Sequence, residues 1–289
     1  MSRYVIITPA HNEEAFIEKT IRSMIAQSTP PLRWIIVNDA SNDSTAKIVA
    51  QHLQECNFLR LVTIERPPGR DFTNKVTAFR RGFAELADCN YDFLGNLDAD
   101  VSFTDDYFAL LLREFALDSK LGIAGGMVAT RVGSQYISQE VALDSVAGAV
   151  QLFRRTCFED IGGYHALPRG GIDAAAEIKA RMKGWRVRTF AQHKVLEHRR
   201  TGTASASPLK ARLNEGRRLY CLGYDFSFYV LRCLYRFTDR PWMIGSIVAL
   251  WGFVSSWLRR EPIALPIDVV LYLRAEQRSK ILDRLRRFN

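Results

Sequence analysis

Four short apolar runs alternate with amphipathic stretches in the first third of the chain, and this alternation most constrains the fold. The apolar runs occupy residues 4–8, 34–37, 59–65 and 91–97. Helical periodicity fills the intervals at residues 13–27, 44–54 and 75–87. Strands that are apolar throughout need cover on both faces. The pattern therefore predicts an α/β domain with a mostly parallel central sheet and helices on both of its faces.

This domain is predicted to continue to about residue 205. A helix is expected over residues 173–183 and a strand over residues 185–190, while three glycine pairs, at 125–126, 162–163 and 170–171, are expected to form turns. The small polar sequence TGTASASP at 201–208 predicts a boundary. The expected domains are therefore residues 1–205 and a helical region at 206–289, which begins with a basic helix over 209–222.

Polar clusters follow three of the predicted strands, at residues 8–14, 38–44 and 98–100. In open parallel sheets, ligands bind beyond the carboxyl ends of the strands. These clusters therefore predict a ligand site at one edge of the sheet. The first strand is not followed by the glycine pattern GxGxxG, which argues against a dinucleotide as the ligand.

Asp98 and Asp100 end the fourth predicted strand as an Asp-Ala-Asp motif. Two carboxylates at this spacing can reach one hard divalent cation, and Mg²⁺ or Mn²⁺ prefers such oxygen ligands together with substrate phosphates. Aspartate-rich turns are also common without any metal, so an interpretation as a plain turn stays open for the motif taken alone.

The order of several motifs resembles a known family. They are TPAHNEE (8–14), VNDASNDST (37–45), NKVTAFRRG (74–82), NLDADV (96–101), KGWRV (183–187) and HRRTGTA (198–204). Over roughly residues 2–204 the set resembles the inverting family 2 glycosyltransferases of bacterial cell-envelope and exopolysaccharide synthesis. The resemblance implies a GT-A fold, with nucleotide-sugar binding in residues 1–101 and acceptor binding in 102–205. It also implies a UDP- or GDP-sugar donor and a lipid-linked or other saccharide acceptor, with Mg²⁺ or Mn²⁺ as the cofactor.

Matching motif positions carry the family's donor-binding roles onto this chain. The resemblance implies that the base and ribose pocket is lined by Thr8, Pro9, Ala10 and Glu13. It implies that Asp39 binds the base edge, that Lys75 approaches the base or the diphosphate, that Asp98 faces the ribose or donor sugar, and that Asp100 holds the metal. Simpler interpretations stay open: helix capping for Asn12 and Asp43, a turn for Asp39, and a solvated helix position for Lys75.

Asp173 is the candidate catalytic base. An inverting transfer needs a carboxylate that takes the proton of the attacking hydroxyl. The family has a Glu-Asp pair before the helix that leads to Gly-Trp-Arg, and Asp173 matches the second acid, whereas Ile172 replaces the first. The alternative role for Asp173 is the N-cap of the following helix, and Glu177, one turn along that helix, is then the next candidate base. The missing acid also supports the alternative function, a non-catalytic, membrane-associated nucleotide-binding or scaffold protein.

The end of the predicted domain carries weaker candidates. The resemblance implies that His198 completes the metal shell, and a packed histidine is the alternative. Arg199 and Arg200 are expected to contact either the donor diphosphate or phospholipid. The QxxRW motif of processive synthases is absent from the sequence, which favours a single transfer per binding event.

The five cysteines are dispersed, without a CxxC pair or a His/Cys cluster. This arrangement argues against a zinc site and for reduced thiols in a cytosolic compartment. No leader pattern precedes the first strand, so we expect the first domain to stay on the cytoplasmic side.

The net positive charge of the chain is concentrated in its last third. Residues 1–198 hold 23 Lys and Arg against 24 Asp and Glu, whereas residues 199–289 hold 17 against 7. This region also contains an uncharged, tryptophan-containing stretch at 241–258, flanked by arginines and short for a span. Both features predict a buried hairpin or in-plane helix on an anionic membrane, at its cytoplasmic face, and a soluble helical subdomain is the alternative. No nucleic-acid-binding motif is visible.

Overall fold

The computed structural model describes residues 2–65, 73–132, 135–138, 142–199, 207–237 and 243–286. The chain divides into two compact units. Unit 1 consists of Met1–Ala166 and Ile172–Arg200, and unit 2 of Leu167–Gly171 and Thr201–Asn289. The break at residue 200 lies close to the expected boundary at 205, whereas the short segment 167–171 groups with the C-terminal helices.

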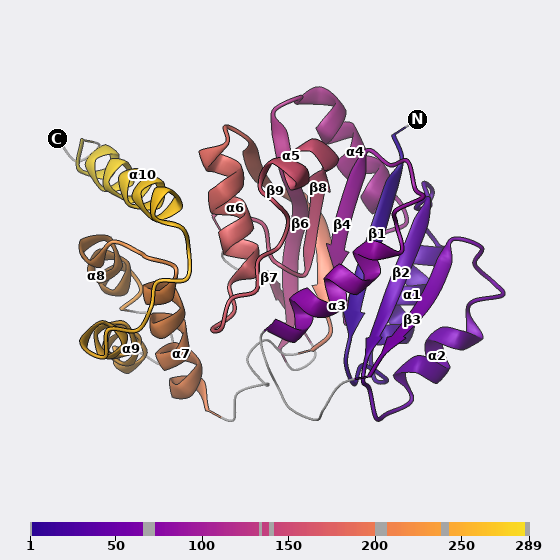
Figure 1. Cartoon of the computed structure of the whole chain (residues 1–289), viewed down its shortest axis with the longest axis horizontal. Helices are drawn as coiled ribbons and strands as arrows, with labels where there is room; N and C mark the ends of the chain where they lie inside the picture. The colour runs from indigo at the N-terminus through magenta and orange to yellow at the C-terminus, as the bar shows by residue number, and fades with distance from the viewer. Residues whose placement is uncertain are drawn as a thin grey trace. The chain divides into compact units, whose positions relative to one another are not determined.

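Unit 1 is built on a sheet whose described strands all belong to one layer (Figure 1). They are β1 (Tyr4–Ala10), β2 (Arg33–Asp39), β3 (Leu59–Ile64), β4 (Phe93–Leu97), β5 (Val101–Phe103), β6 (Leu121–Val132), β7 (Gln135–Ser138), β8 (Val150–Arg154) and β9 (Arg186–Glu197). Their order is β3-β2-β1-β4-β8-β6-β9-β5, with β7 paired to β6. The strands β1 to β4 pair in parallel, whereas β8 runs antiparallel to β4 and β6.

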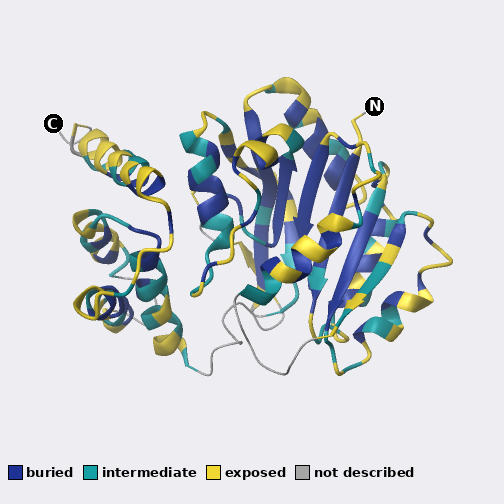
Figure 2. Ribbon diagram, viewed as in Figure 1, coloured by how far each residue is buried: buried dark blue, intermediate teal, exposed yellow. Residues whose placement is uncertain are grey.

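Helices cover both faces of this sheet, as predicted. One face carries α1 (Ile17–Ile25), α2 (Thr45–Gln51) and α4 (Tyr107–Leu117), and the other carries α3 (Thr73–Ala84), α5 (Arg155–Asp160) and α6 (Ile172–Met182). Successive residues of a strand point to opposite faces. Tyr4 and Ile6 therefore enter one core and Val5 and Ile7 the other. The buried strands form the dark central layer in Figure 2.

The prediction that residues 125–126 form a turn is wrong, because both glycines lie inside the long strand β6. A Cβ atom at Gly126 would lie 2.2 Å from the main-chain oxygen of His193, and one at Gly125 would lie 2.7 Å from that of Val150. These glycines allow close strand contacts instead of a reversal. The pairs at 162–163 and 170–171 do form turns, since all four residues have positive φ angles.

Unit 2 contains four described helices, α7 (Pro208–Cys221), α8 (Phe226–Tyr235), α9 (Ile244–Leu258) and α10 (Ile267–Arg286). The basic helix predicted at 209–222 is thus confirmed as α7. Helices α7 and α9 meet through two glycines: a Cβ at Gly216 would lie 1.9 Å from the Ala249 oxygen, and one at Gly252 would lie 2.2 Å from the Leu213 oxygen. Within the described ranges, no helix combines the length and apolarity that crossing a bilayer requires.

Candidate active site

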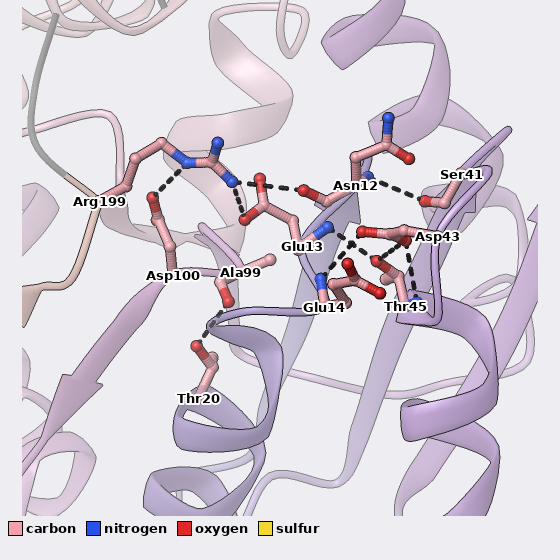
Figure 3. Close-up of polar contacts among 10 residues, drawn as sticks. All are labelled: Asn12, Glu13, Glu14, Thr20, Ser41, Asp43, Thr45, Ala99, Asp100 and Arg199. Atoms are coloured by element: carbon pink, nitrogen blue, oxygen red, sulfur yellow. Dashed lines mark hydrogen bonds and ion pairs between the residues drawn. The ribbon is translucent and has the colours of Figure 1, made fainter. Parts of the chain in front are cut away.

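The loops after β1 and β2 are joined by hydrogen bonds at the carboxyl edge of the sheet (Figure 3). The main-chain N–H of Glu13 donates to Thr45 Oγ1 at 2.7 Å, and that of Glu14 donates to Asp43 Oδ2 at 3.1 Å. Asp43 Oδ1 also accepts the N–H of Thr45 in the first turn of α2. Asp43 therefore has the local helix-start role that the sequence left open, and it also fixes the loop that carries Glu13.

Asp98 and Asp100 follow β4 at this edge, and a basic side chain pairs with each. Lys75 Nζ of α3 lies 2.5 Å from Asp98 Oδ1. The Arg199 guanidinium lies with its Nε 3.3 Å from Asp100 Oδ2, and its Nη2 pairs with Glu13 (Figure 3). Thr20 of α1 donates to the main-chain oxygen of Ala99 at 2.8 Å and holds the short motif against the domain. The structure thus brings together Glu13, Lys75, Asp98 and Asp100, which the sequence predicted to share one site.

The electrostatic environment of Asp100 is unfavourable for a bare carboxylate. Burial, together with the negative charges of Asp98, Glu13 and Glu197, raises the pKa of Asp100 to about 7, and Arg199 opposes this rise only partly. Burial likewise raises the pKa of Glu13 against the opposing effect of Arg199. This part of the site would be stabilised by additional positive charge.

Asp173 lies in the first turn of α6, where a negative side chain also stabilises the helix dipole. A Cβ atom on Gly148 would lie 2.7 Å from Asp173 Oδ2, so glycine allows the main chain to lie close to this carboxylate. Burial acts to lower the pKa of Lys75, but Asp98, Asp173 and Asp100 outweigh it and raise that pKa. Asp173 therefore acts on the same lysine as the two carboxylates that follow β4. Ile172, in place of the expected acid, packs against the apolar core.

Glu177, one turn beyond Asp173, is the next candidate base from the sequence, and its contacts in the structure are those of a structural residue. Only 4% of it is exposed, and it accepts hydrogen bonds from Val146 N at 2.7 Å, Ser145 Oγ at 2.8 Å and Gln151 Nε2 at 3.1 Å. Burial raises its pKa to about 7. These bonds fix α6 to the segment that carries Gly148, so Glu177 supports the position of Asp173 and does not face a substrate itself.

The other donor-site candidates lie at the ends of β1 and β2. Thr8 is buried and its hydroxyl accepts the indole N–H of Trp34 at 2.9 Å, whereas Pro9 is partly exposed and Ala10 is buried. Asp39 is 5% exposed, and its main-chain oxygen lies 2.6 Å from His11 Nδ1. The strand ends therefore place these residues beside the joined loops, with Thr8 turned into the core.

His198 is engaged through both ring nitrogens. Its Nε2 lies 2.8 Å from Ser102 Oγ and its Nδ1 lies 2.7 Å from the Tyr136 hydroxyl. Burial and the positive charges of Lys19 and Arg131 lower its pKa and so favour the neutral ring. A metal-binding role would require His198 to exchange one of these hydrogen bonds for the ion.

The carboxylate oxygens fit a hard divalent cation. No group of three or more His, Cys, Asp or Glu side chains in the described part of the chain is arranged to enclose a metal. The acidic surroundings of Asp100 nevertheless favour positive charge, and Mg²⁺ usually takes only one or two protein carboxylates together with substrate phosphates. Asp98 and Asp100 are the residues that would hold such an ion, in company with a donor diphosphate.

Comparison with solved structures identifies the fold. A mannosyltransferase, PcManGT from Pyrobaculum calidifontis, solved with GDP-Man and Mn²⁺, matches with a TM-score of 0.56 and 18% identity, over 97% of this chain and 80% of that one. Staphylococcus aureus TarS 1-349 in complex with UDP-GlcNAc matches with a TM-score of 0.56 and 15% identity, over 87% and 71% of the two chains. The fold is therefore that of the GT-A nucleotide-sugar transferases.

The particular family follows from sequence. The family model described as "Glycosyl transferase family 2" matches residues 5–165, which is more than half of the chain, and this chain belongs to that family. It is 25% identical over 197 residues to the poly-beta-1,6-N-acetyl-D-glucosamine synthase of Staphylococcus aureus (strain COL), covering 62% of this chain and 45% of the synthase. The synthase of Staphylococcus epidermidis is 25% identical over 171 residues, with 53% and 39% covered. The chain thus spans less than half the length of these relatives.

Proposed function

We propose that this protein is an inverting glycosyltransferase that moves a sugar from a UDP- or GDP-sugar to a hydroxyl group of a saccharide acceptor. One observation carries the proposal: the ends of β1, β2 and β4 gather carboxylates at one sheet edge, and helices α3 and α6 add Lys75 and Asp173 to the same electrostatic site. Asp98 and Asp100 would hold a metal ion that offsets the charge of a diphosphate leaving group, and Lys75 would add a further positive charge. Asp173 would supply the base.

The reaction can be written with the residues of this site. Asp173 accepts the proton of the acceptor hydroxyl while the oxygen of that hydroxyl forms a bond to the anomeric carbon of the donor. The bond from that carbon to the diphosphate oxygen breaks, and the nucleoside diphosphate leaves with the electron pair. Lys75, which pairs with Asp98, would offset the developing charge. A Mg²⁺ or Mn²⁺ ion bound at Asp98 and Asp100 would offset the same charge.

The choice of donors and acceptors draws on the relatives. The two structural neighbours bind UDP-GlcNAc and GDP-Man, and the curated relatives are named as synthases of a polysaccharide. On this basis we propose a nucleotide-sugar donor and a lipid-linked saccharide acceptor in cell-envelope polysaccharide synthesis. A screen for nucleotide release, with UDP- and GDP-sugars as donors and membrane lipid extract as acceptor, identifies both partners.

Peripheral attachment to the cytoplasmic face of a membrane is part of the proposal. Helix α9 exposes Ile247, Trp251 and Trp257 and is followed by Arg259 and Arg260, and unit 2 carries the net positive charge of the chain. At 1.5 Å per residue the 15 residues of α9 extend about 22 Å, short of the roughly 30 Å of a bilayer core. In-plane binding fits this length. Flotation of the full chain with anionic vesicles tests it, and failure to float would contradict it.

The base assignment is tested by the pair Asp173→Asn and Asp173→Ala. Asn keeps the shape and helix-start properties of Asp but cannot accept the proton. We expect Asp173→Asn to lower kcat on the order of 10²-fold or more, with donor affinity and melting temperature nearly unchanged. Steady-state kinetics, donor titration calorimetry and thermal melts measure the three quantities.

The same experiment separates the alternatives. Near-normal turnover by Asp173→Asn would remove Asp173 from the mechanism, and a loss of only about 1 kcal/mol of stability in Asp173→Ala would then mark it as a helix-start residue. Nucleotide-sugar binding without turnover on any lipid acceptor by the wild type would favour the non-catalytic alternative, which the replacement of the expected acid by Ile172 supports.

A further inference from the structure

The short segment Leu167–Gly171 belongs to unit 2, although the residues before and after it in the chain, Ala166 and Ile172, belong to unit 1. Helix α6 begins directly after this segment and carries Asp173 in its first turn. The proposed base therefore lies only two residues beyond a segment that groups with the C-terminal helices. The connection between the two runs through the chain itself.

An ion pair within unit 2 ties this segment to the end of α9. Arg169, the only charged residue of the segment, has its Nη2 2.8 Å from Glu261 Oε2, and the two side chains are 33% and 17% exposed. The Sγ atom of Cys221, the last residue of α7, lies 3.9 Å from the same carboxylate oxygen. Because the pair is partly buried, salt screens it less than an exposed pair.

Glu261 is in turn fixed to α9 by the main chain. Its N–H donates to the Ser256 oxygen at 3.0 Å, and the N–H of Arg260, which has a φ of 53°, donates to the Trp257 oxygen at 3.0 Å. This pair of bonds with one left-handed residue is a Schellman motif, which ends a helix with a defined geometry. Glu261 is therefore held in a fixed position relative to the last turn of α9.

The two glycines at the end of the segment form a tight turn beside α7. Gly170 donates its N–H to the Leu167 oxygen at 3.1 Å, and Gly170 and Gly171 have φ angles of 73° and 86°, which favour glycine. A Cβ atom at Gly171 would lie 3.2 Å from Arg218 Cδ and 3.3 Å from Leu222 Cδ1. The segment is thus packed on the end of α7 up to the residue that precedes α6.

We propose that Arg169 is a positioning residue for the base: through Glu261 it ties the start of α6, and with it Asp173, to the end of α9. The inference rests on the proposed function, in which Asp173 takes the proton of the acceptor hydroxyl. A base must lie within hydrogen-bond reach of that hydroxyl, and a small displacement lowers the rate strongly. Unit 2 thereby sets the position of a base that unit 1 carries.

Hydrogen exchange tests the tie without donor or acceptor, so it decides the matter even if the protein transfers no sugar. We expect Arg169→Gln in the full chain to raise the exchange rate of the main-chain N–H groups of residues 167–178 several-fold. Arg278→Gln is the matched control, because it removes the arginine of another ion pair of unit 2, 3.3 Å from Asp225, and should leave that rate unchanged. Equal exchange in Arg169→Gln and the wild type would overturn the proposal.

Kinetics test whether the tie acts through Asp173. Nucleotide release is measured from UDP-GlcNAc or GDP-Man with membrane lipid extract as acceptor. We expect Arg169→Gln to lower kcat about tenfold with the donor KM nearly unchanged, and to have no further effect in an Asp173→Asn background. The reversed pair, Arg169→Glu with Glu261→Arg, should recover most of the kcat that each single change loses. Additive losses in either combination, in protein that melts as the wild type does, would overturn the proposal.

Discussion

Asp100 in unit 1 and Glu215 in unit 2 are both mostly buried carboxylates, but their surroundings have opposite charge. Asp100 is surrounded by Asp98, Glu13 and Glu197 with a single arginine in contact, and its pKa rises to about 7. Glu215 is surrounded by three arginines, and its pKa falls although burial acts in the other direction. The first environment favours an added cation, whereas the second favours the charged form of its own carboxylate.

This difference suggests a functional role for Asp100 and a stabilising role for Glu215. A carboxylate held among like charges costs folding free energy and persists where its charge has a use. A carboxylate held among arginines offsets charges that would otherwise repel one another. We therefore expect mutation of Asp100 to affect activity, and mutation of Glu215 to affect folding of unit 2.

The largest expected effect follows from Asp100→Asn. Under the proposed function, turnover should fall about 10³-fold, because the carboxylate that would hold the metal is lost. The melting temperature should stay equal or rise, since Asn removes a desolvated charge. Kinetics and thermal melts measure both, with Asp105→Asn, an exposed neighbour, as the control. Turnover near the wild-type value would end the metal role of Asp100.

Glu215→Gln should have the opposite result. Three arginines would lose their common partner, and we expect a loss of about 2 kcal/mol in the stability of unit 2. Donor binding by unit 1 should be unchanged in calorimetric titration. Asp283→Asn, an exposed change in the same unit, is the control. If chemical denaturation showed no loss of stability, Glu215 would not be the partner that holds the arginine cluster together.

Glu177 tests whether burial by itself is sufficient to raise a carboxyl pKa. Its folded pKa is about 7 against 4.5 for the free group, so the folded protein holds the proton more tightly. The contribution to stability is complete below about pH 4.5 and is lost as pH rises through 7, by on the order of 2 kcal/mol. Denaturation at about pH 5 and about pH 8 should show a smaller pH effect in Glu177→Gln than in the wild type. Identical pH effects in the two proteins would contradict the assignment, and Glu159→Gln, at an exposed ion pair, serves as the control.

The smallest expected effect is that of Arg199→Gln on the affinity for a cation. The guanidinium pairs with Asp100 and Glu13, where it competes with an added cation. We expect the variant to bind Mn²⁺ about tenfold more tightly than the wild type in the absence of a donor, measured by calorimetry. Arg22→Gln on the exposed side of α1 should leave the affinity unchanged. A weaker affinity in Arg199→Gln would show that the arginine supports the cation site and does not compete for it.

Much of unit 1 was predictable because its signals are local. The apolar runs of β1 to β4, the amphipathic intervals between them and the polar clusters after them all lie within short stretches of sequence. The carboxyl ends of parallel strands meet at one edge, so the sequence predicts that Asp98 and Glu13 are neighbours. The misassigned pair Gly125–Gly126 shows the limit of local signals, since a glycine that admits a neighbouring strand and one that turns the chain look alike in sequence.

The sequence by itself determined the α/β character, the position of the acidic motif and the concentration of positive charge in the last third. Only the tertiary structure decided how these charges are paired. Arg199 meets Glu13 across 186 positions of sequence, Glu177 meets Ser145 across 32, and the arginines around Glu215 come from two helices. The physical reason is that a pKa or an ion pair depends on burial and on distances of a few ångströms. Packing of the sheet and helices sets these quantities, whereas periodicity and motif order do not encode them.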